Sequence, residues 1–80
     1  MENKVLKQKK LDKELNLKVT EDVYLHRIHV EFYSDDRKFI LQKSFQNTFL
    51  GQIESEKFSK SLKSLKELQN RLGYNRNPKM

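Results

Sequence analysis

The strongest constraint on the fold is an alternation of apolar and polar residues in the stretch VYLHRIHVEFYSDDRKFILQKSF, from Val23 to Phe45. Side chains two residues apart lie on the same face of a β-strand. One predicted face therefore carries Tyr24, His26, Ile28, Val30 and Phe32, and the other carries Arg27, His29, Glu31 and Tyr33. After the polar segment SDDR, the apolar residues Phe39, Leu41 and Phe45 alternate again. The stretch predicts a β-hairpin with one apolar face.

A chain reversal over Asp35 and Asp36 brings the two apolar sets to the same side of this hairpin. The resulting register pairs Phe32 with Phe39, Val30 with Leu41, Ile28 with Lys43, and His26 with Phe45. Asp-Asp is not a residue pair that favours the tightest hairpin turns, so a four-residue loop is equally compatible with the pattern. Lys43 is the one charged residue on the apolar face. It must lie at an edge, extend its ammonium group to solvent or mark a β-bulge.

The flanking segments supply further elements. Leu15, Leu17 and Val19 alternate with polar residues and predict a short strand, whereas residues 46–53 form either another short strand or a loop. Ser55 fits a helix N-cap and Gly73 a left-handed C-cap. Between them, apolar residues follow helical spacing at Phe58, Leu62, Leu65, Leu68 and Leu72. Residues 1–13 are predicted to be a basic, flexible arm or a short frayed helix, and residues 74–80 a polar tail.

These elements predict a single α+β domain over residues 14–73. Its small antiparallel sheet has three or four strands and is covered on one face by a single C-terminal amphipathic helix. A chain of 80 residues buries only a small core, so a homodimer would add stability. The sequence has neither the apolar core of a signal peptide nor a run of apolar residues that could span a membrane. We therefore expect a cytoplasmic protein without a membrane partner.

The sequence lacks the residue combinations that catalysis requires. His26 and His29 are three residues apart, so on a strand they point to opposite faces and cannot bind one metal ion. The pattern predicts instead that His26 is half-buried and His29 faces solvent. There is no cysteine, and two glycines are too few for a phosphate-binding loop. The serines of the predicted helix have no histidine positioned to activate them. We expect no enzyme, no metal and no cofactor.

The positive charge lies at the two ends of the chain. Residues 1–20 hold six lysines against three acidic residues, residues 48–80 hold seven basic against three acidic residues, and the segment between them is nearly neutral. The candidate phosphate contacts are Lys7, Lys9, Lys10 and Lys13 in the arm and Lys57, Lys60, Lys63, Lys66 and Arg71 along the helix. An ordinary solubilising helix face and a disordered basic end are the alternatives for these two groups.

A third candidate surface is the outward face of the hairpin. Its residues Arg27, His29, Tyr33, Lys38 and Gln42 are candidate contacts to a protein partner or to bases. Because Tyr33 is the only aromatic residue among them, base stacking is less favoured there than phosphate contact by the arm and helix.

The leading hypothesis is a small basic non-enzymatic nucleic-acid-binding accessory or regulatory protein, with DNA favoured over RNA. The alternative is a protein-binding inhibitor or adaptor of the phage or mobile-element type that acts through the β-hairpin. A third hypothesis is a structural subunit whose lysines serve only solubility. One contiguous positive surface joining the arm to the helix would favour the nucleic-acid hypothesis, whereas lysines scattered over the whole molecule would weaken it.

Overall fold

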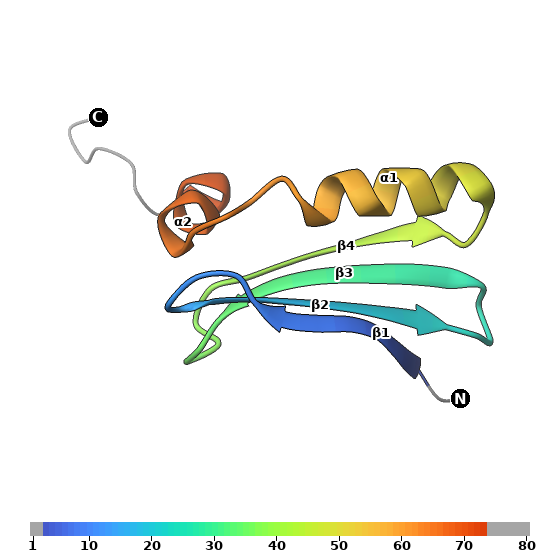
Figure 1. Cartoon of the computed structure of the whole chain (residues 1–80), viewed down its shortest axis with the longest axis horizontal. Helices are drawn as coiled ribbons and strands as arrows, with labels where there is room; N and C mark the ends of the chain where they lie inside the picture. Colours follow the sequence, from blue (N-terminus) through green and yellow to red (C-terminus); the bar gives the residue numbers. More distant parts are fainter. Residues whose placement is uncertain (1–2, 74–80) are drawn as a thin grey trace.

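The computed structural model describes residues 3–73 and has a sheet layer and a helical layer (Figure 1). The sheet has four antiparallel strands in the order β1-β2-β3-β4. The strands are β1 Asn3–Lys10, β2 Leu15–Asp22, β3 Arg27–Ser34 and β4 Ile40–Gln46. The helices are α1 Phe49–Ser59 and α2 Leu65–Leu72. The predicted α+β class, with an antiparallel sheet covered by C-terminal helical structure, is confirmed. The predicted tail at residues 74–80 lies outside the described residues.

The core lies between the sheet and the two helices. Its buried apolar residues are Leu15, Leu17, Val19, Ile28, Val30, Phe32, Phe45, Leu62 and Leu68. The ring of Phe58 on α1 packs edge-on against Phe32 at a centroid distance of 5.5 Å and lies 5.8 Å from the ring of Phe45. Aromatic pairs of this geometry stabilise a core beyond the area that they bury. They fix α1 over β3 and β4.

The N-terminal segment corrects one prediction. Residues 3–10 are neither an arm nor a frayed helix but form β1, which pairs with β2 from Asn3 opposite Asp22 to Lys10 opposite Asn16. The domain therefore extends beyond the predicted start at residue 14. Lysine and glutamine have weak strand propensity, so the residue pattern did not indicate this strand. The unpaired edge of β2 supplies the hydrogen bonds that order it, and lysine is a common residue on such exposed edge strands.

The hairpin register also differs from the prediction. Phe32 lies opposite Leu41, Val30 opposite Lys43 and Ile28 opposite Phe45, which is a shift of two residues. The loop of residues 35–39 is longer than predicted, and Ser34 closes it by donating its backbone N–H to the carbonyl oxygen of Phe39 at 3.0 Å. Because side chains repeat every two residues along a strand, this shift leaves the apolar face intact.

Lys43 does lie on the helix-facing side of β4, without a bulge. The register between β3 and β4 is continuous there. The Lys43 ammonium group is 5.4 Å from the ring centre of Phe45 and 5.5 Å from that of Phe58. Its aliphatic stem covers the edge of the core while the charge reaches the surface, with a cation–π contribution from both rings.

The predicted single helix is two helices. α1 begins after Thr48, whose Oγ1 accepts a hydrogen bond from the N–H of Gly51 at 3.1 Å, so Ser55 is an interior residue and not the N-cap. A second cap at Ser64 accepts from the N–H of Glu67 and starts α2. The apolar spacing runs unbroken across this interruption, which is why periodicity alone did not reveal it. Gly73 ends α2 in the predicted left-handed conformation, with φ of 84°.

The loop of residues 35–39 makes stability sensitive to acid. Lys10 and Asn16 donate to the Asp35 carboxylate at 2.6 and 2.8 Å and hold its pKa below the ordinary 3.8. The hydroxyl of Ser34 and the N–H of Lys38 donate to Asp36 at 2.6 and 3.0 Å and lower its pKa likewise. A carboxylate whose pKa is lower in the folded state stabilises the fold above its ordinary pKa and loses that contribution as pH falls through the folded pKa.

We therefore expect the free energy of unfolding to decrease on acidification below about pH 5, and the double variant Asp35→Asn, Asp36→Asn to reduce this dependence. Urea unfolding followed by circular dichroism across a pH series measures it. Asp12→Asn, in the exposed β1–β2 turn, is the matched control. An acid dependence that is equal in the double variant and the wild type would refute the assignment.

None of the helices within residues 3–73 combines the length and the apolar character needed to cross a membrane.

Candidate nucleic-acid interface

A basic groove runs between β1 and the chain segment that joins the two helices. It encloses about 420 Å³ and is lined by Lys7, Lys9, Leu11, Leu17, Ser59, Lys60, Leu62 and Lys63. Two of its lysines belong to the predicted N-terminal group and two to the predicted helical group. The fold thus brings residues more than 50 positions apart in the sequence to one hollow.

A β-bulge determines which lysines of β1 face this groove. The register shifts between Val5, opposite Thr20, and Lys7, opposite Val19. After the shift, Lys7 and Lys9 pair with Val19 and Leu17, whose side chains are buried on the helix side of the sheet. Residues directly opposite each other in a ladder share a face. Lys7 and Lys9 therefore point toward the helical layer, and Gln8 and Lys10 point away from it.

The opposite wall is made by the interruption between the helices. α1 ends at Ser59, and Lys60 and Lys63 lie in the segment before α2. Leu62, which is 3% exposed, anchors this segment to the core between the two lysines. The interruption that the sequence pattern did not reveal is therefore what places Lys60 and Lys63 beside β1.

The groove carries four ammonium groups, and two carboxylates neighbour its lining residues: Glu56, and Glu67, which accepts the backbone N–H of Lys63 at 2.7 Å. Glu56 lies 3.8 Å from the Lys7 ammonium and 3.2 Å from that of Lys60. The hydrogen bond from Lys60, followed by the charge of Lys7, holds the pKa of Glu56 below its ordinary value. Within residues 3–73 the ammonium groups of Lys9 and Lys63 have no ion pair. The groove therefore keeps an excess of positive charge that can attract an anion.

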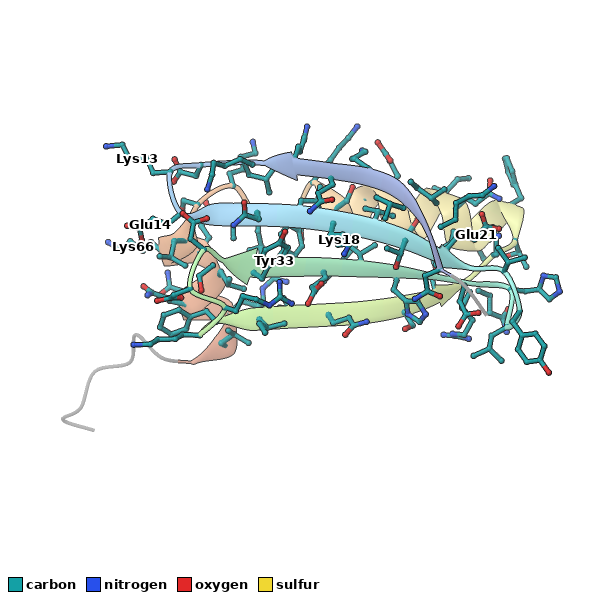
Figure 2. The ribbon with its side chains drawn as sticks, turned by 90° about the horizontal axis from the view of Figure 1, so that it is seen from below. Lys13, Glu14, Lys18, Glu21, Tyr33 and Lys66 are labelled. Atoms are coloured by element: carbon teal, nitrogen blue, oxygen red, sulfur yellow. The ribbon has the colours of Figure 1, made fainter. Side chains whose placement is uncertain are left out.

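The other predicted phosphate contacts lie elsewhere. Lys10 binds Asp35 across the open face of the sheet at 2.6 Å. Lys13 and Lys66 lie with Glu14 at the end of the molecule that holds α2 (Figure 2). Arg71 lines a separate hollow beside Glu67, and Lys57 is exposed on α1 outside the groove lining. Four of the nine predicted residues gather at the groove, and five do not line it.

The open face of the sheet, seen in Figure 2 with Lys18 and Tyr33 toward the viewer, carries most of the third candidate surface. Arg37 lies 4.4 Å above the Tyr33 ring centre and binds Glu31 at 3.0 Å. The amide of Gln8 donates to the Tyr33 hydroxyl at 3.3 Å. Of the other predicted residues, Arg27, His29 and Gln42 lie on the strands, while Lys38 lies in the β3–β4 loop. Many of the polar groups on this face are thus engaged with one another.

The two histidines exchange their predicted environments. His26 is exposed in the turn between β2 and β3, at φ of 56°, together with Tyr24, which was also predicted to lie on the strand. His29 is the half-buried one: its Nδ1 lies 2.6 Å from the Ser44 hydroxyl and its Nε2 lies 4.0 Å from Asp22. Among residues 3–73, no three His, Cys, Asp or Glu side chains are grouped to hold a metal ion.

The Asp22, His29 and Ser44 cluster contains the residue types of a hydrolase triad. Ser44 lies on the edge strand β4, and the 4.0 Å between His29 Nε2 and Asp22 is longer than a hydrogen bond. The cluster joins side chains of β2, β3 and β4 on the open face of the sheet.

Comparisons of this chain with protein-family models, with curated proteins and with solved structures return no match.

Sequence reasoning missed the apolar floor of the groove, formed by Leu11, Leu17 and Leu62. In the sequence, Leu17 and Leu62 are ordinary core candidates and Leu11 lies in the predicted arm, and only the pairing of β1 with β2 brings lysines alongside them.

Proposed function

We propose that this protein is a small basic non-enzymatic nucleic-acid-binding accessory or regulatory protein that holds a phosphate backbone in the basic groove. The observation that carries the proposal is the meeting of Lys7 and Lys9 on β1 with Lys60 and Lys63 between the helices. A contiguous cationic surface built from both ends of the chain is the arrangement that favours a polyanion over a role in solubility alone.

The lining of the groove supports contact with the backbone and not with the bases. Lysine ammonium groups neutralise phosphates, and the leucine floor offers an apolar surface to the sugars. The lining contains no aromatic side chain on which a base could stack. We therefore propose binding with little sequence preference, with DNA as the favoured ligand. Phosphate chemistry is common to DNA and RNA, so both belong in the test.

The alternative, a protein-binding inhibitor or adaptor acting through the hairpin, has weaker support. Its candidate residue Tyr33 is covered by Arg37 and bonded to Gln8, and His29 is bonded to Ser44. A partner would have to displace these contacts. This hypothesis becomes the leading one if no nucleic acid binds.

The proposal predicts a binding constant that falls log-linearly with salt concentration. Fluorescence anisotropy of labelled duplex DNA, single-stranded DNA and RNA, each titrated with the full chain across a salt series, measures it. We expect micromolar affinity at low salt and a negative slope of log K against log salt, since each neutralised phosphate releases counterions. Unrelated sequences of the same length should bind equally. An absence of binding to all three nucleic acids at low salt would refute the proposed function.

A further inference from the structure

One end of the molecule exposes more apolar surface than its fold requires. This end holds the β2–β3 turn and the start of α1, at the right of Figure 1. The exposed fractions are 50% for Val23, 80% for Tyr24, 58% for Leu25, 79% for Phe49, 62% for Leu50 and 39% for Ile53. We call these six residues the apolar tip. The N–H of Asn47 donates to the carbonyl oxygen of His26 at 2.9 Å and joins its two segments.

The composition of the turn is unusual for a solvent-exposed connection. Turns are ordinarily built from Gly, Asn, Asp, Ser and Pro. This turn instead has the sequence Val-Tyr-Leu-His, and it holds His26 in the left-handed region, which a non-glycine residue adopts at some cost. Neither the turn geometry nor solubility requires exposed Tyr24 and Leu25. Their presence is explained if another surface covers them.

We propose that the apolar tip is the interface of a symmetric homodimer, in which the tips of two copies pack against each other about a two-fold axis. At the exposed fractions above, the six side chains offer roughly 600–800 Å² of surface, which lies within the roughly 600–1,000 Å² per partner of stable interfaces. An apolar patch on a monomer rarely exceeds a few hundred Å². The available area therefore suffices for a second copy.

The distribution of charge favours the tip as the place where two basic molecules meet. The chain carries a net charge of +6, so two copies repel each other over most of their surfaces. The segments 20–26 and 46–55 that build the tip contain neither lysine nor arginine and carry the carboxylates Glu21, Asp22 and Glu54, so the positive charge that repels two copies elsewhere is absent from them. A two-fold axis through the tip also closes the assembly, since one self-complementary patch satisfies both copies. The basic groove contains none of the tip residues and stays open in such a dimer.

The test is the molar mass of the full chain without nucleic acid, by light scattering and sedimentation over a concentration series. We expect a concentration-dependent approach to twice the chain mass of 9.7 kDa. Phe49→Glu should return it to the monomer. Phe49 is the first residue of α1, where a carboxylate favours the helix, so this variant should keep its fold. Ile40→Glu, at an exposed apolar position on β4 away from the tip, should remain dimeric.

A spin label locates the contact independently of these substitutions. The chain has no cysteine, so His26→Cys, in the same turn but outside the six tip residues, and Ile40→Cys each give a single labelling site. The tip-to-tip dimer predicts a short distance between the two labels at position 26 and a much longer one at position 40. A monomer at all concentrations, an open-ended series of larger species, a Phe49→Glu variant as dimeric as the wild type, or the reverse order of label distances would each overturn the proposal.

Discussion

Replacing Gly51 by alanine is expected to destabilise the protein by about 2–3 kcal/mol, which in a domain of this size lowers Tm by about 10–20 °C. Alanine ordinarily stabilises a helix interior relative to glycine by about 0.5–1 kcal/mol, so the expected sign is the opposite of the usual one. At this position a Cβ atom would overlap the carbonyl oxygen of Gln46 and lie 2.9 Å from its carbonyl carbon. That carbonyl also accepts the N–H of Thr48 at 2.9 Å.

The clash involves backbone atoms, so no side-chain rotation can relieve it, and α1 must move away from the end of β4. Thermal and urea unfolding of Gly51→Ala and wild type measure the loss. Glu54→Ala, at an exposed position on the same helix, introduces an alanine away from the Gln46 carbonyl and is the control. A Gly51→Ala variant that is equal to or more stable than the wild type would show that α1 does not dock on β4 as described.

The second large effect is expected at the basic groove. A variant in which Lys7, Lys9, Lys60 and Lys63 are all glutamine should bind duplex DNA at least about tenfold more weakly at low salt, which corresponds to about 1.4 kcal/mol or more. Glutamine keeps the length and polarity of the side chain while it removes the charge. Because Lys9 and Lys63 make no ion pair within residues 3–73, and the other two share Glu56, the fold should tolerate these changes.

A control variant must remove the same charge without touching the groove. Lys13, Lys18, Lys38 and Lys66 meet this requirement, since they lie in turns, on the open face and on α2, and do not line the groove. Changing all four to glutamine lowers the net charge equally. If binding depends on net charge alone, the two variants lose affinity equally, whereas the proposal requires a clearly larger loss in the groove variant.

Much of the fold could be predicted because the alternation of apolar and polar residues is regular in two segments of the sequence. The alternation of Leu15, Leu17 and Val19, and of Ile28, Val30 and Phe32, correctly predicted which face of the sheet is buried. Every second side chain of a strand lies on the same face, so an error of two residues in the hairpin register leaves the predicted buried face unchanged.

The groove could not be predicted for a different reason. Its position depends on β1, whose residues have no apolar alternation because an edge strand is ordered by the free edge of its neighbour. It also depends on the interruption at residues 60–64. There the hydrogen bond from the N–H of Glu67 to the Ser64 hydroxyl sets the start of α2, although Leu62 and Leu65 continue the apolar spacing. The sequence indicated two groups of lysines, but only tertiary structure selected the pairs Lys7 with Lys9 and Lys60 with Lys63.

The most direct test of the basic groove as a phosphate-binding surface is the salt dependence of duplex DNA binding in the wild type and the two glutamine variants. Four phosphate contacts contribute about 3 to 4 to the slope of log K against log salt. We expect the groove variant to lose a slope of this size and the control variant to keep the wild-type slope. An unchanged slope in the groove variant, with a flattened one in the control, would contradict this expectation and place the phosphates elsewhere on the molecule.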